Sequence, residues 1–498
     1  MAEERLDTRG RPRLTISSDL DGDRQAPGDS AGHGAKASPV MRRATGVAGI
    51  RRGAAAARQN LAVSSLRHRP RVGTARSEPP EWLLDHGDRN MHALGPGPEL
   101  EAEWTAAGLR LPDRRAIRRY RLERVRAQLR GAGCDAALLY DPLNIRYATD
   151  TTNMSIWTMH NAVRYAFVAA DGPVVLFEFS KGEFLDTHSE VVDEIRPGLS
   201  YIYFYAGNRA EEVAGGWADE IVELMAEHGR GDRRLAVDQL DLIGTRALEA
   251  RGVCLVDASA LMEEARVVKS SEEIAAMRCA VHACEAAVGD MRAAFEPGVT
   301  EMALWAVLQA GNFARYGEWI ETRLLASGPR TNPWYQEASS RQVQAGELMG
   351  FDTDMICAYG VCVDISRTWL CGDGRPTPAQ HDVWSLAVEQ IERNRELHQP
   401  GVSVRDIVER SWYPSLEDYN CYTVLSHGVG LCDEYPSVFT RERWGRQGYD
   451  TELQPGTVMC VEAFVGPKRG GEGVKLEQQV LITETGNELL SQYPLSLV

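Results

Sequence analysis

Two acidic residues stand inside apolar, strand-like segments near the end of the chain, and this feature strongly limits how the chain can fold. Glu462 lies in MCVEAFVG and Glu477 lies in VKLEQQVL. A lone carboxylate is costly to bury in such surroundings. Each glutamate therefore needs a cation or a hydrogen-bond partner, which the rest of the fold must supply.

Four more residues that suit a metal site lie upstream. GFDTDMICAYGVCVDISRTW holds Asp352, Asp354 and Asp364, and SHGVGLCDE holds His427. Hard oxygen ligands with one imidazole suit two divalent first-row ions bridged by carboxylates. Five buried acids without such cations would repel one another or take up protons. We therefore expect these four residues and the two glutamates to bind two divalent metal ions.

The spacing of the three aspartates indicates a hairpin. Alternate residues of a strand share a face, so Asp352 and Asp354 should project together and Thr353 should turn away. The chain should reverse around residues 358–360. This reversal would return Asp364 to the same space on the partner strand.

The composition fits an enzyme of more than one domain that acts on a small molecule. The 498 residues suffice for roughly two to three domains, and 43% hydrophobic residues allow sizeable cores. No apolar run approaches the ~20 residues of a membrane-spanning helix. A net charge of −16 disfavours binding to nucleic acid. Ten cysteines without a CxxC pair, and no secretory signal, predict a cytoplasmic location.

The first 95 residues differ from the rest of the chain. They are rich in Arg, Ala, Gly and Pro, and between Met41 and Pro80 they are poor in acids and in periodic apolar positions. Acids near the start argue against a transit peptide. We predict a disordered extension over residues 1–95, and Met91 is a candidate for the natural start.

Residues 100–265 alternate strands and helices. A helix is predicted over residues 116–131, strands over 134–140, 165–170, 173–179, 201–206, 234–238 and 252–256, and a further helix over 245–250. This order predicts an α/β domain. The sequence has no GxGxxG or GxxxxGKS motif, so nothing indicates nucleotide binding.

Residues 266–498 begin with a helix signal. Ser270 is a good N-cap, Glu273 completes a capping box, and apolar residues follow at spacings of three and four. A second helix is predicted over residues 378–398, because Pro400 and Gly401 follow it. The metal-binding segments should form strands around these helices.

The order Asp, Asp, His, Glu, Glu resembles a known family. With DISRTW after the second ligand strand and HGVG around the histidine, it looks like the metallopeptidase family of methionine aminopeptidase, prolidase, aminopeptidase P and creatinase. The resemblance implies an α/β protein with a creatinase-type N-terminal domain over residues 100–265 and a "pita-bread" catalytic domain over residues 266–498. Relatives of this fold are commonly dimers, which implies a homodimer.

Three departures separate the chain from the peptidases of that family. Peptidases carry a second histidine in a pattern like HGxGxxxHExP, whereas this chain reads HGVGLCDEYP, with Asp433 and Glu434. They place another histidine beyond an SGPN-like turn, whereas SGPRTNPWYQE over residues 327–337 has none. Where the family's spacing from Asp364 predicts one aspartate, this chain has Thr353 between two.

These departures are similar to the dimethylsulfoniopropionate lyases of the DddP type, which cleave this sulfonium zwitterion into acrylate and dimethyl sulfide. Matching stretches run from DPLNIRYATD and GEWIETRLLASGPRTNPW to the two glutamate strands. The resemblance implies metal ligation by the six residues above, with iron favoured and manganese or zinc as alternatives. It also implies Asp433 as the catalytic base, with Tyr422 nearby.

The residue types fit such an elimination independently of the resemblance. A carboxylate such as Asp433 can accept the proton beside the substrate carboxylate, and a metal that holds that carboxylate acidifies the carbon. Aromatic faces in an acidic pocket suit a sulfonium cation. We therefore expect Trp334, Tyr335 and Trp157 to contact the substrate of a metal-dependent carbon–sulfur lyase. For each of these aromatic residues, the alternative is core packing.

Other interpretations stay open. An Xaa-Pro aminopeptidase or dipeptidase is the second functional hypothesis, and a catalytically silent binding module is the third. Instead of acting as the base, Asp433 could pair with Arg367 or cap a turn. Tyr422 could only orient a ligand by a hydrogen bond. His160 and His398 have no partner pattern, so we expect them to be solvated or internally satisfied.

Overall fold

A computed structural model describes residues 95–498 of the chain. The predicted extension, apart from residue 95, and the candidate start at Met91 lie outside the described residues. Within residues 95–498, none of the helices is both long and apolar enough to cross a membrane.

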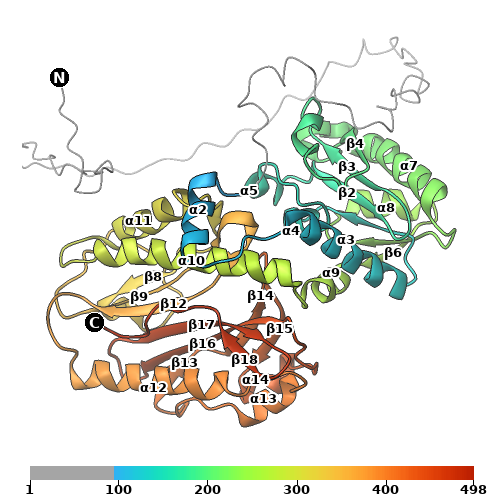
Figure 1. The fold of residues 1–498 in the computed structure, drawn as a ribbon. Coiled ribbons are helices and arrows are strands. Elements are labelled where there is room, and N and C mark those ends of the chain that lie inside the picture. Colours follow the sequence, from blue (N-terminus) through green and yellow to red (C-terminus); the bar gives the residue numbers. More distant parts are fainter. Residues whose placement is uncertain (1–94) are drawn as a thin grey trace, which may run out of the picture. The chain divides into compact units, whose positions relative to one another are not determined.

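The first half of the described chain is built on a mixed sheet (Figure 1). Its strands are β1 (Ala136–Leu139), β2 (Tyr165–Ala169), β3 (Val174–Glu178), β4 (Glu194–Pro197), β5 (Arg234–Val237) and β6 (Cys254–Asp257). They lie in the order β4-β3-β2-β1-β5-β6. The pairs β1/β2 and β2/β3 are antiparallel, and the other pairs are parallel.

Helices cover both faces of this sheet. They include α3 (Arg114–Gly131), α4 (Pro142–Thr149), α7 (Ala210–His228), α8 (Leu242–Glu249) and α9 (Ser259–Arg266). Two short helices, α5 (Ser155–Thr158) and α6 (Tyr203–Ala206), contribute no residue to the apolar clusters on either face. Ala137 and Leu139 pack in the apolar cluster with α3 and α9, whereas Leu138 packs in the cluster with α7 and α8. Successive strand residues point to opposite faces, so β1 is apolar on both. The predicted α/β class is confirmed for this half.

One predicted strand of this half is wrong. Residues 201–206 contain helix α6 in place of a strand, and the side chains of Tyr203, Phe204 and Tyr205 are exposed. Aromatic residues favour strands where a neighbouring strand and a packed face cover them. Here the aromatic run does not pair with the edge strand β4, and no packed face covers its side chains.

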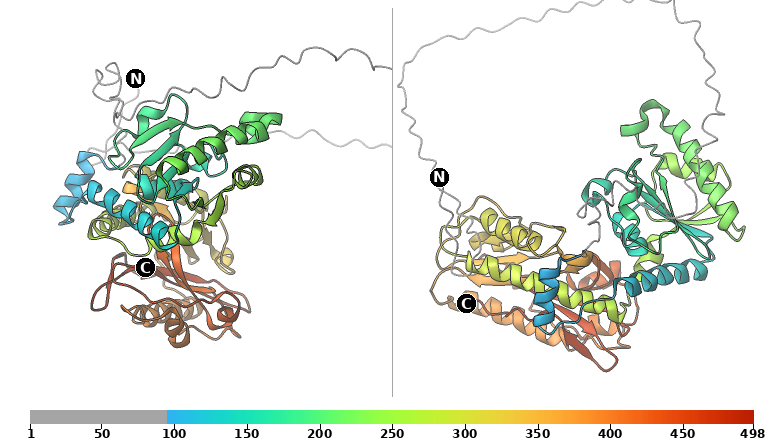
Figure 2. Two further views of the ribbon diagram at one scale, coloured as in Figure 1. Left: turned by 90° about the vertical axis from the view of Figure 1, so that its right-hand side faces the viewer. Right: turned by 45° about the horizontal axis from the view of Figure 1, so that its top comes forward.

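The second half holds its strands between helices (Figures 1 and 2). The helices are α10 (Ser271–Ala293), α11 (Glu301–Phe313), α12 (Pro378–Arg395), α13 (Val404–Arg410) and α14 (Arg441–Gln447), and α2 (Pro98–Ala106) packs in the same core as α10. Phe351 and Trp369 pack in that core, whereas Leu348 and Leu370 pack against α12. Side chains that alternate along the strands therefore bury both faces.

The strands of this half form three sheets. They are β7 (Trp319–Ile320), β8 (Leu325–Ser327), β9 (Leu348–Asp352), β10 (Met355–Ile356), β11 (Cys362–Val363), β12 (Ser366–Leu370), β13 (Tyr419–Cys421), β14 (Val424–Val429), β15 (Asp433–Phe439), β16 (Val458–Pro467), β17 (Val474–Ile482) and β18 (Asn487–Leu489). Their orders are β12-β9-β8, β11-β10-β7 and β15-β14-β16-β17-β18, with β13 paired to β16.

The predicted helix signals are confirmed. The Ser270 hydroxyl accepts the backbone N–H of Glu273, and the Glu273 carboxylate accepts the N–H of Ser270, which completes the capping box at the start of α10. Helix α12 starts at Pro378, as predicted, and ends at Arg395, slightly before the predicted residue 398.

The predicted reversal after the first two aspartates is also confirmed. Strands β10 and β11 pair antiparallel, with Met355 opposite Val363. The turn between them contains Tyr359 at φ 65° and Gly360 at φ 67°. A Cβ atom on Gly360 would lie 2.1 Å from the Cζ atom of Arg146. Glycine is needed there both for the left-handed backbone and for the buried guanidinium beside it.

We expect Gly360→Ala to lower the free energy of unfolding by about 1–3 kcal/mol, because alanine adds backbone strain and a clash at this turn. Urea unfolding followed by tryptophan fluorescence measures the change. The control is Gly374→Ala, since the Cβ position of exposed Gly374 has no atom within 4 Å and its φ is not positive. Equal stability of the two variants would contradict the prediction.

Candidate metal centre and active site

The two buried glutamates face each other across neighbouring strands. Glu462 of β16 lies directly opposite Glu477 of β17 in the antiparallel register. Their side chains are 3% and 0% exposed. Within the described part of the chain, the Oε1 atom of each lacks a hydrogen-bond partner. Two buried carboxylate oxygens on the same side of a sheet, with only Nε2 of His427 as a charged neighbour among residues 95–498, at 3.3 and 3.8 Å, are available to a cation.

The three aspartates converge beside this pair, although not by simple strand alternation. β9 ends at Asp352, and Asp354 takes a left-handed backbone at φ 34°. The Thr353 hydroxyl turns away, as predicted, and donates to the Val363 carbonyl at 2.8 Å while accepting the Ile365 N–H at 2.9 Å. The prediction of one regular strand is therefore wrong, because Thr353 takes over ladder hydrogen bonds and kinks the chain.

The kink still places the carboxylates together. Ligand oxygens of Asp352, Asp354 and Asp364 all lie within 4.8 Å of one another. A second group joins Asp364 to His427, Cys460 and Glu477 within the same limit. Asp364 belongs to both groups, which is the arrangement expected of a carboxylate that bridges two ions.

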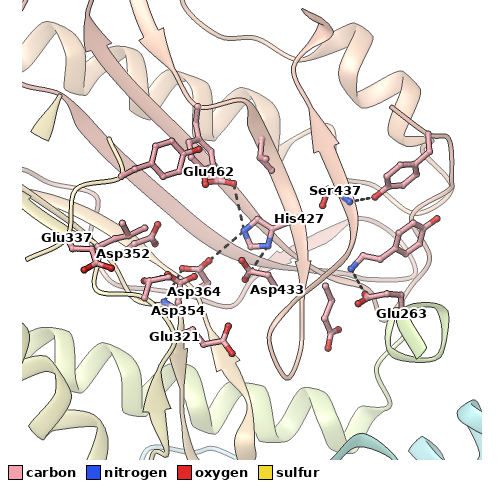
Figure 3. Close-up of a pocket in the computed structure, with 18 residues that line it drawn as sticks. Glu263, Glu321, Glu337, Asp352, Asp354, Asp364, His427, Asp433, Ser437 and Glu462 are labelled. Carbon is pink, nitrogen blue, oxygen red and sulfur yellow. Dashed lines mark hydrogen bonds and ion pairs between the residues drawn. The ribbon is translucent and has the colours of Figure 1, made fainter. Parts of the chain in front are cut away.

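His427 of β14 presents Nε2 to the carboxylates. Nε2 lies 3.6 Å from Asp364 and 3.8 Å from Glu462 (Figure 3). It also lies 3.3 Å from Glu477. Nδ1 lies 3.0 Å from the Gly428 carbonyl, which can only accept, so Nδ1 carries a proton. This hydrogen bond orients the ring with Nε2 toward the centre.

Two residues of the centre were not predicted from the sequence. Cys460 lies opposite His427 in the β14/β16 pair. Burial raises the pKa of its thiol well above the usual value. Its place two residues before Glu462, on the same strand face, is the signal that could have revealed it.

Lys475 is the second unpredicted residue, and it is fully buried. Its Nζ donates to Asp352 and Glu477 at 2.9 Å each and lies 3.1 Å from Glu462. Burial opposes its charge, but these carboxylates outweigh burial and raise its pKa well above the usual value. A lysine two residues before Glu477, and therefore on the same face of the strand, was the sequence signal.

The charges of the centre remain unbalanced without metal ions. Burial raises the pKa of Glu462 to about 8, although Lys475 opposes this rise. Burial and the neighbouring Asp354 carboxylate raise the pKa of Asp364 well above its usual value.

The histidine of the centre is shifted by the same carboxylates. Burial lowers the pKa of His427, but the carboxylates of Asp433 and Glu477 outweigh burial, and the net shift of this pKa is upward. Five carboxylates that share one lysine and one histidine fit divalent cations.

A cavity of about 720 Å³ opens beside these residues. It is lined by Asp352, Asp354, Asp364, His427, Glu462, Asp433, Glu263, Glu321, Glu337, Glu434 and the tyrosines Tyr335, Tyr422, Tyr435 and Tyr449, among others. Carboxylates dominate the wall, so the cavity favours a positively charged ligand.

Asp433 lies at the start of β15 and points into this cavity (Figure 3). Its side chain is 53% exposed, and its Oδ1 lies 3.6 Å from Nδ1 of His427. Desolvation by the cavity walls raises its pKa, and the charge of His427 opposes the rise. The alternative pairing with Arg367 is not observed, because that guanidinium binds the Tyr493 and Glu477 carbonyls.

The structure separates the predicted aromatic residues. Tyr335 and Tyr422 line the cavity with ring centroids 5.4 Å apart. Trp334 is buried and packs on Phe464, which matches the core alternative. Trp157 lies in a different hollow, so the structure does not bring it to this cavity.

The two unassigned histidines behave as expected. His160 is exposed. His398 is buried, with Nδ1 2.8 Å from the Asn394 carbonyl and Nε2 2.8 Å from the Ser426 hydroxyl.

Replacing Lys475 by methionine should lower the free energy of unfolding of the metal-free protein by about 3–5 kcal/mol, because three buried carboxylates lose their shared counter-charge. Urea unfolding in the presence of a chelator measures the loss, and added manganese should restore part of it. Lys181→Met is the control, since Lys181 is exposed. A loss as small as that of the control would contradict the prediction.

Comparisons with known proteins agree with this architecture. The chain matches the family models of the Creatinase/Prolidase N-terminal domain over residues 121–268 and of metallopeptidase family M24 over residues 275–484. Both matches confirm the predicted order of a creatinase-type domain and a pita-bread domain. The prolidase of Pyrococcus horikoshii, at 20% identity and a TM-score of 0.60 over 76% of this chain and 99% of the prolidase, shares the fold.

Two relatives are much more similar in sequence. The dimethylsulfoniopropionate lyase DddP of Roseovarius nubinhibens is 46% identical over 82% of this chain and 93% of the relative. The lyase of the same name from Roseobacter denitrificans is 44% identical over 82% of this chain and 92% of the relative. The Xaa-Pro aminopeptidase of Escherichia coli is 25% identical over 59% of this chain and 68% of the relative.

Proposed function

The chain belongs to metallopeptidase family M24 and, within it, to the family of the dimethylsulfoniopropionate lyases DddP, and on this premise we propose that it is a metal-dependent carbon–sulfur lyase. It cleaves dimethylsulfoniopropionate into acrylate and dimethyl sulfide. The observation that carries this conclusion is the likeness to two such lyases over nearly their whole length. The carboxylate-lined cavity suits their cationic substrate.

The peptidase alternative has weaker support. The Xaa-Pro peptidases are distant relatives, and the chain has Asp433 and Glu434 where the peptidase pattern carries its second histidine. A silent binding module is disfavoured by the enzymatic relatives and by the intact set of ligand residues.

The proposed metal ligands are five carboxylates and one imidazole. They are Asp352, Asp354, Asp364, His427, Glu462 and Glu477. The unpartnered oxygens of the two glutamates and the oxygen-rich donor set support two divalent ions, and we favour iron. When bound, such ions supply Lewis acidity toward the substrate carboxylate.

Asp433 is the proposed catalytic base. It accepts the proton from the carbon beside the substrate carboxylate, and the electron pair of that bond forms the double bond of acrylate. The carbon–sulfur bond breaks at the same time, and its electron pair leaves with neutral dimethyl sulfide. The open position of the Asp433 carboxylate in the cavity wall supports this role.

Tyr335 and Tyr422 are the proposed contacts of the sulfonium group. Their rings lie together on the cavity wall, and aromatic faces attract cations. The Lys475 ammonium lies over the Tyr422 ring, 5.3 Å from its centroid, which holds this ring beside the metal centre. The predicted contact by Trp334 is indirect in this proposal, because that ring packs behind the cavity.

Three further predictions remain proposals. The domain boundaries at residues 100–265 and 266–498 are supported by the family matches, which fall close to these limits. A cytoplasmic location is supported by ten cysteines that are all free in the described residues. A homodimer rests on the resemblance alone.

Purified protein supplied with iron should release dimethyl sulfide from dimethylsulfoniopropionate, and Asp433→Asn should lower kcat by about 10²–10⁴-fold, since the amide cannot accept the proton. Headspace gas chromatography measures the product. Asp382→Asn on the exposed face of α12 is the control and should keep full activity. Release of proline from Xaa-Pro peptides without dimethyl sulfide would instead establish the peptidase.

Protein produced in iron-rich medium should hold two metal ions per chain by inductively coupled plasma mass spectrometry. Asp364→Ala should remove both ions, because this carboxylate belongs to both ligand groups. Asp354→Ala should affect one ion more than the other. Folded protein that retains no stoichiometric iron, manganese or zinc would refute the metal centre.

A further inference from the structure

The turn that carries Asp433 is folded around the side chain of the next residue. Glu434 is buried, with its side chain 1% exposed. Its Oε1 accepts the backbone N–H of Leu431 at 3.0 Å. A Cβ atom on Gly430 would lie 2.4 Å from the Glu434 Oε2 atom. The turn between β14 and β15 therefore closes directly onto this carboxylate, and Gly430 leaves the room for it.

Two cations fix the Glu434 carboxylate, and both come from residues 263–269, the end of α9 and the residues just after it, which we call the interdomain segment. Lys269 Nζ lies 2.9 Å from its Oε2, and Arg266 Nε lies 3.2 Å from its Oε1. Both cationic side chains are nearly fully buried. Removal of one partner from such a buried ion pair would leave an uncompensated charge in the interior, which is strongly destabilising.

The residue after Glu434 is tied to the same segment. The backbone N–H of Tyr435 donates to Glu263 at 2.8 Å (Figure 3), and Glu263 also pairs with Arg266. The end of α9 and the residues just after it thus hold two consecutive residues of β15.

Asp433 itself has no comparable anchor among the described contacts. Its nearest charged neighbour there is His427, at 3.6 Å. Among the described side-chain hydrogen bonds, the contact at Asp433 runs from the Cys432 thiol to its backbone carbonyl, at 3.1 Å. Asp433 and Glu434 both contribute to the cavity wall, but the Glu434 carboxylate is 1% exposed and binds Arg266 and Lys269, whereas the Asp433 side chain is 53% exposed. The position of the Asp433 carboxylate is therefore set by the backbone around it.

We propose that Glu434 is a positioning residue, which holds Asp433 at the proton-transfer distance by anchoring its turn to Arg266 and Lys269. This inference rests on the proposed function, in which Asp433 is the base. A shift of about 1 Å in a reacting group can cost about 10²-fold in rate, so a buried anchor one residue away controls kcat without touching the substrate.

The test uses the metal-loaded, full-length enzyme and measures kcat and KM for dimethyl sulfide release. Glu434→Gln should lower kcat by about 10- to 100-fold, with KM changed less than about 3-fold and two metal ions retained. In the Asp433→Asn background, Glu434→Gln should cause no further loss, because its effect acts through Asp433.

The matched control is Glu273→Gln, which weakens another buried ion pair. Arg121 and Glu273 lie 2.6 Å apart, and each side chain is 5% exposed. This variant should lower Tm about as much as Glu434→Gln while leaving kcat unchanged. Gly430→Ala is a second probe, since its methyl group displaces the Glu434 carboxylate without removing an ionisable group. It should reproduce the loss of kcat, and it replaces Glu434→Gln if that variant does not fold.

Three outcomes would overturn the inference. Wild-type kcat in both Glu434→Gln and Gly430→Ala would exclude the anchor, even if Asp433→Asn is inactive. Equal losses from Glu434→Gln with and without Asp433 would assign it a general structural role. Full activity of Asp433→Asn would refute the proposed base, and the positioning role would fall with it.

Discussion

The structure of the second half depends on one electrostatic constraint, which is the burial of several carboxylates around a single lysine. Lys475 satisfies oxygens of Asp352, Glu462 and Glu477, yet each of the two glutamates keeps an oxygen that lacks a hydrogen-bond partner among the described residues. One ammonium and one imidazole cannot balance five carboxylates in a medium that screens charge weakly. The fold tolerates this deficit where divalent ions can meet it, so the same residues that destabilise an empty centre create a site for metal ions.

The strands around this centre have irregularities where ligands must converge. The paired strands β16 and β17 supply two glutamates by register alone. The aspartates need the kink at Thr353, whose hydroxyl replaces ladder hydrogen bonds and lets Asp354 adopt a left-handed backbone. The turn before β15 then places Asp433 at the cavity while Glu434 ties it to the interdomain segment. Strain and buried charge are thus concentrated at the residues that would do the chemistry.

The shared fold does not explain the chemistry. This chain shares its fold with a prolidase at only 20% identity, so the chemistry must be read from the side chains at the site. In this chain a short turn carries carboxylates in place of the peptidase histidine, and the cavity wall is rich in acids and tyrosines. A carboxylate can take a proton from carbon, and such a wall attracts a sulfonium cation, so the changes at the turn and in the cavity favour one reaction.

The sequence by itself determined that six candidate ligand side chains converge, that the chain reverses before Asp364 and that Ser270 starts a capped helix, because each depends on local spacing or on the cost of burying a carboxylate. It did not reveal Lys475 and Cys460 at the centre, nor the separation of Trp157 from the cavity. It also misassigned the aromatic run at residues 201–206, since strand propensity says nothing about whether a neighbouring strand and a packed face cover the segment. Only the tertiary structure decides such points, because they depend on which distant segments become neighbours and on how their charges meet in the interior.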